Sequence, residues 1–342
     1  MTPSTDGRPV RFTLDTSKLD LSPEDMLEMY STMVLVRNVD ERIWIMNRQG
    51  KAAIVASCQG HEAAQLGAVW AMRQEPNAAY FPYYRDMAMA IGLGVTAKET
   101  MLGFLAKEGE RHSGARQFGL QGIRPDLKLY NNSNVVCTQV PQAVGYALGC
   151  KISKEPVVVI TCFGDGAASQ GDCHEAMNFA AIHKLPVIFF CENNKYAISV
   201  PLSKQMAIAN VAERAQAYGM PGVIVDGTDI LATYQATEEA VRRAAQGGGP
   251  TLIEAKVERY LPHTSDDDDT RYRPQEEVQE ARKYDPLRLF KEFLISKGVL
   301  TEALDQRFQQ EARAEVNQAT EFAEQAPFPK ADDFLEHVYG SS

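Results

Sequence analysis

Two short polar motifs end two apolar runs in the middle of the chain, and together they could hold a metal-bound diphosphate. Gly164-Asp165-Gly166 follows the apolar run 157–162, and Asn193-Asn194-Lys195-Tyr196 follows the apolar run 186–191. Mg²⁺ binds a few carboxylate and amide oxygens together with phosphate oxygens and water. Asp165 and Asn194 are therefore candidate magnesium ligands, and the glycines allow a phosphate to approach the backbone closely.

The two apolar runs must place these motifs side by side. Continuous apolar runs of this length are typical of strands buried on both faces of a parallel sheet. In a doubly wound sheet the ligand crevice lies at the carboxyl ends of the strands. We expect a helix to open directly after Gly166, and its N-terminus would favour the same anion.

The rest of the chain alternates helical and extended patterns, which predicts an α/β fold with a doubly wound, mainly parallel sheet and flanking helices. Ser22, with Asp25 three residues later, predicts the start of the first helix. Expected helices are 23–48, 63–72, 138–152, 230–245 and 286–326, and expected strands are 222–225 and 251–257. The segment 105–134 is expected to be a long loop over the site. Residues 1–20 are expected to be a flexible arm, 21–330 a single domain and 331–342 a tail.

The expected helix 138–152 carries small residues on its surface. They are Ala143, Gly145, Ala147 and Gly149, at every second position. Small residues permit close contact between helices, so we expect this helix to lie against another one, within the chain or across a subunit boundary.

Neither polar motif is specific alone, because Asp between glycines is usually a turn and paired asparagines usually form a solvated loop. In combination they resemble the thiamine-diphosphate motif, which begins with GDG and ends with NN. The segments GDGAASQGDCHEAMNFAA and LPVIFFCENNKYAIS further resemble the alpha subunit of the thiamine-dependent 2-oxo acid dehydrogenases, nearest the branched-chain branch. CQGHEAA at 58–64, YYRD at 83–86, TQVPQAVGYALG at 138–149 and HTSDDDDTRYR at 263–273 follow the family's order. The resemblance implies the thiamine-diphosphate-binding fold.

The resemblance also implies the residues of a cofactor site. Asp165, Asn194 and the Tyr196 carbonyl would bind Mg²⁺, and Tyr84 and Arg85 would contact the diphosphate, which suits the guanidinium fork. The other cofactor positions are Gly164, Gly166, Ala167, Ile198, and Asn134 with Val136, which would hold the aminopyrimidine and the bent form of the cofactor. In some members a potassium ion is bound at the positions of Ser133, Thr138 and Gln139.

His263 is the implied catalytic residue. A histidine in a loop is more often solvated, but the resemblance places this one between the diphosphate and the substrate, where an imidazole could act near neutral pH. The aspartates 266–269 would by their charge favour its protonated form. They replace part of the regulatory serine pattern of eukaryotic relatives, which argues against phosphoregulation.

Two positions depart from the patterns of some relatives. Glu192 stands where some members have an arginine directed at the phosphate. Met87 stands where the pyruvate-specific branch has a histidine, which argues against pyruvate. Pyruvate and acetoin dehydrogenases share most of the motif and stay open as alternatives to 2-oxoisovalerate and its homologues.

The resemblance implies oxidative decarboxylation of a 2-oxo acid with reductive acylation of a lipoyl group on an acyltransferase component. The carboxylate that acts on the aminopyrimidine belongs to the family's beta subunit. Glu62 is a nearby acid, but its place at a helix start indicates packing or capping. We therefore expect an alpha2beta2 heterotetramer and no activity from this chain alone.

Alternatives from other classes remain. A non-catalytic regulatory subunit would bind Mg²⁺ and diphosphate without turnover. A Mg²⁺ phosphatase with Asp165 as nucleophile would usually need a DxD pair, which is absent around it. Gly92 and Gly94 begin a candidate dinucleotide-binding motif, but its third glycine and the preceding strand are missing, which argues against nicotinamide binding. No GxxxxGK[ST] motif occurs, which argues against P-loop phosphoryl transfer.

Composition is that of a globular protein with ample core: 342 residues, 44% hydrophobic and 23% charged. The net charge of −10 argues against a nucleic-acid surface. No apolar run reaches the length of a membrane span, and residues 1–12 show neither signal-peptide nor transit-peptide features, so a cytoplasmic protein is expected. Six cysteines without a CxxC pair predict reduced thiols.

Overall fold

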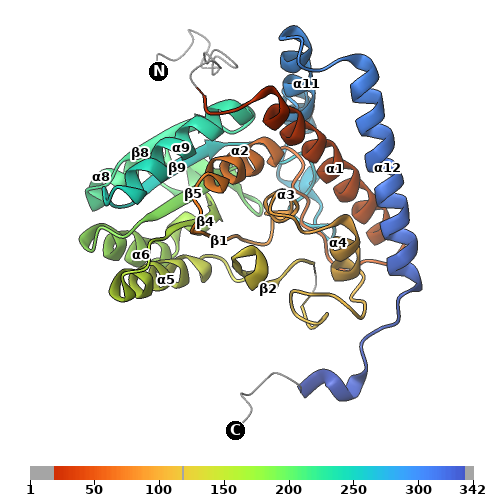
Figure 1. The fold of residues 1–342 in the computed structure, drawn as a ribbon, viewed down its shortest axis with the longest axis horizontal. Coiled ribbons are helices and arrows are strands. Elements are labelled where there is room, and N and C mark those ends of the chain that lie inside the picture. Colours follow the sequence, from red (N-terminus) through yellow and green to blue (C-terminus); the bar gives the residue numbers. More distant parts are fainter. Residues whose placement is uncertain (1–18, 118, 336–342) are drawn as a thin grey trace.

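A seven-stranded sheet organises the fold in the computed structural model, which describes residues 19–117 and 119–335 (Figure 1). Its strand order is β2-β3-β1-β4-β5-β9-β8, and every pair is parallel except β2 with β3. The strands are β1 Ala78–Phe81, β2 Gly122–Arg124, β3 Leu129–Asn132, β4 Val158–Gly164, β5 Val187–Asn193, β8 Gly222–Asp226 and β9 Thr251–Lys256. This arrangement confirms the predicted α/β class with a mainly parallel sheet.

Helices cover both faces of this sheet. One face packs on α5 Gln139–Ser153 and α6 Gly171–Ile182, and the other packs on α2 Glu62–Arg73 and α9 Ile230–Ala245. The side chains of β4 alternate between the two faces. Val159 and Phe163 lie in the core shared with α5 and α6, whereas Ile160 and Cys162 lie in the core shared with α2 and α9. The sheet is therefore doubly wound, as expected.

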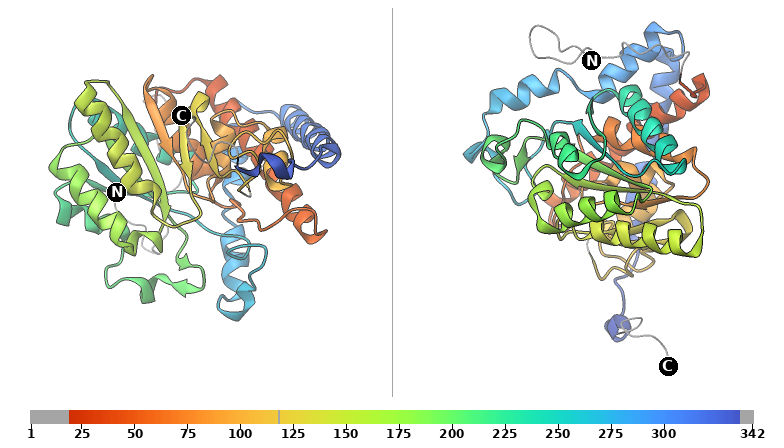
Figure 2. Two further views of the ribbon diagram at one scale, coloured as in Figure 1. Left: turned by 90° about the horizontal axis from the view of Figure 1, so that it is seen from below. Right: turned by 90° about the vertical axis from the view of Figure 1, so that its left-hand side faces the viewer.

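A helical layer continues beyond the second face. It contains α1 Pro23–Arg48, α3 Met87–Gly92, α4 Ala97–Phe104, α10 Gln275–Arg282, α11 Pro286–Ser296 and α12 Glu302–Gln325. The long helix α12 packs along α1, on the side of the molecule away from α5 and α6 (Figures 1 and 2). The Tyr30 hydroxyl donates to Asp305 Oδ1 at 2.6 Å and ties α1 to α12.

Short elements surround the carboxyl ends of β4 and β5. A hairpin of β6 Tyr196–Ala197 and β7 Val200–Pro201 follows β5 and leads into α7 Leu202–Gln205. Further along, a 3₁₀ turn at Val211–Arg214 and α8 Ala215–Tyr218 precede β8.

Most predicted elements are confirmed. The Ser22 hydroxyl accepts from the Asp25 amide and the Asp25 carboxylate accepts from the Ser22 amide, a capping box that starts α1. The helix α9 has the predicted bounds, and β4, β5, β8 and β9 lie within two residues of the predicted strands. All six cysteines are free.

Two predictions are wrong. No helix opens directly after Gly166: a 3₁₀ turn at Ala167–Ser169 comes first, and the extended backbone of Gln170 delays α6 until Gly171. The segment 105–134 is not only loop, because β2 and β3 lie within it and extend the sheet beyond β1. Both strands are short: β3 pairs with β1, which is distant in sequence, and β2 pairs with β3 with an irregular register. The local pattern of apolar residues does not reveal such pairings.

The helix α5 meets its neighbours through only part of its small-residue surface. Ala143 and Ala147 are buried in the core shared with β4 and α6. A Cβ added at Gly145 or Gly149 would meet no atom of the described residues within 4 Å, so nothing in that part of the chain covers the glycine face.

The predicted arm and tail lie mainly outside the described residues, so the domain boundaries stay predictions. None of the helices in the described ranges is both long and apolar enough to cross a membrane.

Candidate functional site

The predicted metal ligands meet where β4 and β5 end. The backbone amide of Asn194 donates to Asp165 Oδ1 at 3.2 Å. The backbone amide of Tyr196 donates to the side-chain oxygen of Asn194 at 3.2 Å. Gly164 pairs with Glu192 in register, so the two motifs begin at the same level of the sheet. Asp165 and Asn194 are both buried. The structure thus brings two candidate oxygen ligands together at the crevice expected for a doubly wound sheet.

The glycine turn faces the hairpin after β5. A Cβ added at Gly166 would lie 2.5 Å from the Ala197 Cβ, whereas one at Gly164 would meet nothing closer than 4.0 Å. Ala167 continues the turn and is buried. Ile198, in the hairpin, has a left-handed backbone with a φ of 55°. Close packing of the hairpin on the turn therefore requires glycine at position 166.

Burial raises the pKa of Asp165, and hydrogen bonds from Gln205 and from backbone amides act against that rise. The Gln205 amide donates to Asp165 Oδ2 at 2.7 Å. A cation beside the carboxylate would favour its charged form. Gln205 was missed by sequence reasoning, since it reaches the site through α7, 40 residues after Asp165.

Buried arginines gather on the phosphate side of the predicted site. Arg85, Arg259 and Arg273 are each almost fully buried. In the described part of the chain no hydrogen-bond partner is found for Arg85 Nε, Arg259 Nε and Nη1, or Arg273 Nη2. Burial and the Arg85 charge lower the pKa of Arg259. Buried polar groups are normally paired, so these unpartnered donors favour an anion at this place.

Arg259 was also missed by sequence reasoning. It follows β9, the strand next to β5, and one of its nitrogens donates to the Ile198 carbonyl at 3.1 Å and to the Tyr272 hydroxyl at 3.0 Å. Its place just beyond a predicted strand end was the signal that could have identified it.

His263 lies beside Tyr84 and Arg85, as the resemblance implied. Arg85 Nη2 lies 3.2 Å from His263 Nδ1 and 3.1 Å from the His263 carbonyl oxygen, and the Tyr84 ring centroid lies 5.9 Å from that of His263. Burial, followed by the charges of Arg85 and Arg259, lowers the pKa of His263 to about 3.

The prediction that aspartates 266–269 would by their charge favour a protonated His263 is confirmed in direction for Asp267, but this charge does not decide the state of the imidazole. Asp267 is the one of them that raises the pKa of His263, and burial and two arginines outweigh it. The Asp267 carboxylate accepts from the His263 backbone amide at 2.9 Å and from the Tyr272 hydroxyl. It orders the loop rather than charging the imidazole.

A cavity of about 140 Å³ lies beside His263. Tyr84, Asn134 and His263 line it, together with Gln121, whose side-chain oxygen accepts from the Asn134 amide. The apolar part of the lining consists of Ile54, Ala56, Met87, Phe104 and Leu120. Val136 is outside this lining and 39% exposed. The cavity thus combines a polar end with an aliphatic and aromatic end.

The predicted potassium residues are neighbours. Ser133 Oγ and Thr138 Oγ1 lie 2.8 Å apart, and both lie 3.0 Å from the Val135 carbonyl oxygen. Gln139 donates to the Cys162 carbonyl at 2.6 Å, and its side-chain oxygen is buried without a partner in the described ranges. The oxygen types suit a hard cation.

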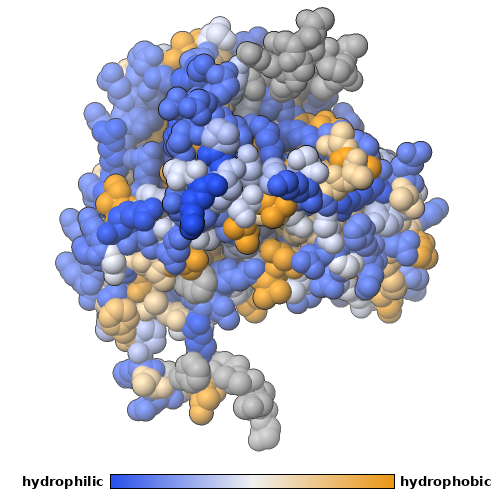
Figure 3. All heavy atoms as spheres, turned by 180° about the vertical axis from the view of Figure 1, so that it is seen from behind, coloured by the Kyte–Doolittle hydropathy of each residue, from blue (hydrophilic) through white to orange (hydrophobic). Residues whose placement is uncertain are grey.

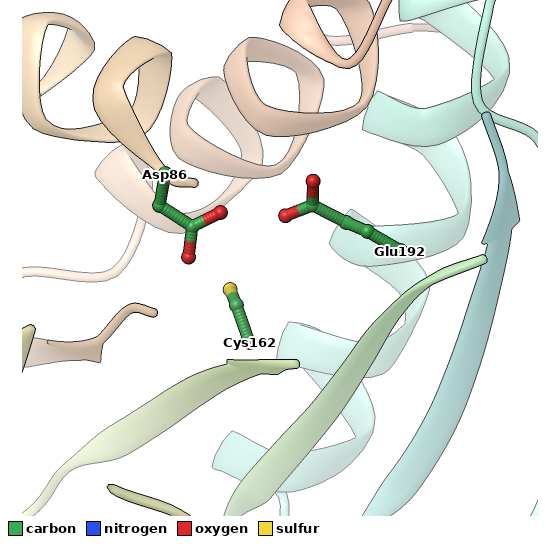
Figure 4. Close-up of side chains that lie close together, drawn as sticks. All are labelled: Asp86, Cys162 and Glu192. Atoms are coloured by element: carbon green, nitrogen blue, oxygen red, sulfur yellow. The ribbon is translucent and has the colours of Figure 1, made fainter. Parts of the chain in front are cut away.

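A second buried group lies behind the site, where Asp86, Cys162 and Glu192 point toward one another (Figure 4). Burial and the Glu192 carboxylate raise the pKa of Asp86 well above its ordinary value. Although burial acts in the opposite direction, the hydrogen bond from His61 holds the pKa of Glu192 below its ordinary value. The two shifts favour the protonated form of Asp86 beside the ionised form of Glu192, and Glu192 faces this core group rather than the arginines.

Comparison with known proteins identifies the family of this chain. Residues 30–332 match the family model described as Dehydrogenase E1 component. The chain is 48% identical over 321 residues to the 2-oxoisovalerate dehydrogenase subunit alpha of Bacillus subtilis (strain 168), covering 94% of this chain and 97% of that protein. It is 40% identical over 323 residues to the pyruvate dehydrogenase E1 component subunit alpha of Staphylococcus aureus (strain Mu50 / ATCC 700699), covering 94% of this chain and 84% of that protein.

A pyruvate dehydrogenase E1 component subunit alpha of Bacillus cereus is 38% identical over 321 residues, covering 94% of this chain and 83% of that protein. The family match spans most of the chain and includes both strand-end motifs. The chain belongs to the dehydrogenase E1 component family.

Proposed function

We propose that this chain is the alpha subunit of a 2-oxo acid dehydrogenase that binds thiamine diphosphate with Mg²⁺ and acts on 2-oxoisovalerate and its homologues. The observation that carries the proposal is the meeting of Asp165 and Asn194 with unpartnered, buried arginines at one edge of the sheet. The family itself implies thiamine diphosphate.

The residues present fit the metal-bound diphosphate. Asp165, the side-chain oxygen of Asn194 and the Tyr196 carbonyl would hold Mg²⁺. Arg85 and Arg259 offer the unpartnered nitrogens that a diphosphate would satisfy. Gly166 leaves the space that the close backbone approach needs. Ser133, Thr138 and the partnerless oxygen of Gln139 would hold a potassium ion.

When bound, thiamine diphosphate supplies an electron sink for loss of carbon dioxide from a 2-oxo acid, while the protein supplies placement. Tyr84 and Arg85 would orient the diphosphate, and Asn134 and Val136 would hold the ring region. Arg85 can only donate, so His263 Nδ1 accepts from it and the neutral imidazole carries its proton at Nε2. His263 can then donate that proton in the cavity it lines.

The apolar end of the cavity supports a branched aliphatic substrate. Met87, Phe104 and Leu120 offer no polar partner, so a branched side chain could be buried against them. The 48% identical relative is named for 2-oxoisovalerate. Pyruvate remains the second candidate, because relatives 40% identical are named for it.

Open apolar surface supports the proposed beta-subunit partner. Val135, Val136 and Ile198, which are close to site residues in the chain, are exposed, and the glycine face of α5 is uncovered. Figure 3 shows apolar residues gathered near the middle of one face amid hydrophilic surface. An alpha2beta2 heterotetramer would cover such surface, and a lipoyl-bearing acyltransferase would receive the acyl group. A cytoplasmic location stays a prediction from the sequence.

The test is decarboxylation by the chain co-expressed with its beta subunit, with 2-oxoisovalerate or pyruvate, with and without Mg²⁺ and thiamine diphosphate. Cofactor-dependent turnover that prefers 2-oxoisovalerate supports the proposal. A preference for pyruvate would move the substrate assignment. Cofactor binding without turnover of either acid would favour acetoin or a non-catalytic subunit.

A further inference from the structure

We infer that His61 is a positioning residue for the metal site: it holds the Asn194 side chain so that the amide oxygen, and not the amide nitrogen, faces the cation. The inference rests on the proposed function, since it concerns the metal that the strand-end motifs would bind. It assigns a role to a fully buried histidine that lies outside both motifs.

The contact that carries the inference joins two side chains from distant parts of the sequence. Asn194 Nδ2 lies 3.5 Å from His61 Nε2, and the Asn194 oxygen points instead to the Tyr196 amide at 3.2 Å. A carbonyl oxygen has two lone pairs, so one remains for a cation. A rotated amide would present two N–H donors to the cation and lose the ligand.

Glu192 determines which nitrogen of His61 can accept. His61 Nδ1 lies 2.6 Å from Glu192 Oε2, and a carboxylate accepts, so Nδ1 carries the proton. The Asn194 amide nitrogen can only donate, so Nε2 is the nitrogen that accepts from it. Such a chain of carboxylate, histidine and ligand is the usual way in which groups behind a metal site orient its ligands.

The Glu192 carboxylate is itself fixed from two further sides. Gln65 donates to Oε2 at 2.9 Å and the Tyr83 hydroxyl donates to it at 3.4 Å. Gln65 also donates to the Arg85 carbonyl at 3.2 Å, which links the metal side of the site to the phosphate side. The other carboxylate oxygen is buried without a hydrogen-bond partner among the described residues, and the carboxylate faces Asp86 (Figure 4).

His61 is also fixed through its backbone, at the residue before α2. A Cβ at Gly60, whose φ is +94°, would lie 2.0 Å from the Glu258 carbonyl oxygen, so only glycine fits there. The Gly60 amide donates to Glu62 at 2.7 Å, and Arg37 donates to the same carboxylate at 2.7 Å. Glu62 is thus a structural residue, as its place at the helix start indicated.

The group of Asp86, Cys162 and Glu192 is not offered as a second metal site. All three residues are fully buried, and the raised pKa of Asp86 favours a proton that would let the two carboxyl groups approach without a cation. Glu192 acts here as the anchor of His61.

The experiment measures the Mg²⁺ concentration that gives half-maximal thiamine diphosphate binding to the assembled alpha-beta enzyme, by titration calorimetry. His61→Leu removes the acceptor and is expected to raise this concentration about 10- to 100-fold. His61→Gln can donate to Glu192 and accept from Asn194, so it is expected to stay within about 3-fold of the unaltered enzyme. His183→Leu, at an exposed histidine on the far end of α6, is the matched control.

An unchanged Mg²⁺ requirement in His61→Leu, or an equal loss in His61→Gln, would overturn the inference. Should His61→Leu not assemble, His61→Asn keeps polarity but is too short to reach both partners, and it is expected to show the same loss. If the unaltered enzyme binds the cofactor without any need for Mg²⁺, the proposed metal site itself fails. The unaltered enzyme therefore separates the two failures.

Discussion

Arg85 Nη2 lies 3.2 Å from Nδ1 of His263, so the Arg85 guanidinium fixes one side of the predicted catalytic histidine. The contact fixes the tautomer of the imidazole and, with burial and Arg259, keeps the imidazole neutral at physiological pH. It connects the arginines that suit a diphosphate with the histidine that lines the substrate cavity.

The pH dependence of stability should reflect this contact. Burial, Arg85 and Arg259 lower the pKa of His263 to about 3 in the folded chain, whereas a histidine in the unfolded chain titrates near about 6.5. Between these values the unfolded state binds more protons, so the free energy of unfolding falls as the pH falls from about 6.5 toward 3.

His263→Gln should reduce this acid sensitivity, measured as the difference in free energy of unfolding between pH 7.5 and pH 5. His183→Gln, at an exposed position, is the control. An acid dependence that is the same in His263→Gln as in the unaltered chain would contradict the lowered pKa.

Arg259→Met should weaken diphosphate binding. Its Nε and Nη1 have no partner in the described chain, and hydrogen bonds between charged groups contribute about 1.5–3 kcal/mol each. The dissociation constant of thiamine diphosphate should therefore rise at least about 10-fold. Calorimetric titration measures the change, with the exposed Arg288→Met as control. Equal affinities for the two variants would remove Arg259 from the site.

Gly166→Ala should destabilise the chain while Gly164→Ala does not. A Cβ at Gly166 would lie 2.5 Å from the Ala197 Cβ, and one at Gly164 meets nothing closer than 4.0 Å. Overpacking of this kind costs about 1–3 kcal/mol. Thermal unfolding of both variants without cofactor measures it, and equal melting temperatures would show that the hairpin β6-β7 moves aside at no cost.

Gly145→Leu should impair assembly without unfolding the chain. Gly145 is exposed and a Cβ there would meet no described atom within 4 Å, so we expect the penalty to come from a partner packed on α5. Sedimentation after co-expression with the beta subunit should show less heterotetramer, with circular dichroism unchanged. Normal assembly would place the interface elsewhere.

The sequence was sufficient to predict the strands β4, β5, β8 and β9 and the motifs that follow β4 and β5. Most residues of β4 and β5 are apolar because both strands are buried on both faces, and Asp165 and Asn194 stand directly at their ends. Those features are local, so a pattern in one segment reports them.

The features that the sequence did not reveal depend on distant partners. Arg259 and Gln205 reach the site from separate elements, and the strands β2 and β3 form only where the sheet edge at β1 accepts them. The lowered pKa of His263 could not be predicted from its acidic sequence neighbours, because burial and the charges of Arg85 and Arg259 outweigh the effect of Asp267.

The most direct test of the central claim is calorimetric binding of thiamine diphosphate to the assembled enzyme with and without Mg²⁺, for the unaltered chain and Asp165→Ala. If the ends of β4 and β5 hold the metal-bound diphosphate, the unaltered enzyme binds the cofactor tightly only with Mg²⁺, and Asp165→Ala loses that dependence together with most of the affinity. Equal, Mg²⁺-dependent affinity in both proteins would contradict the account.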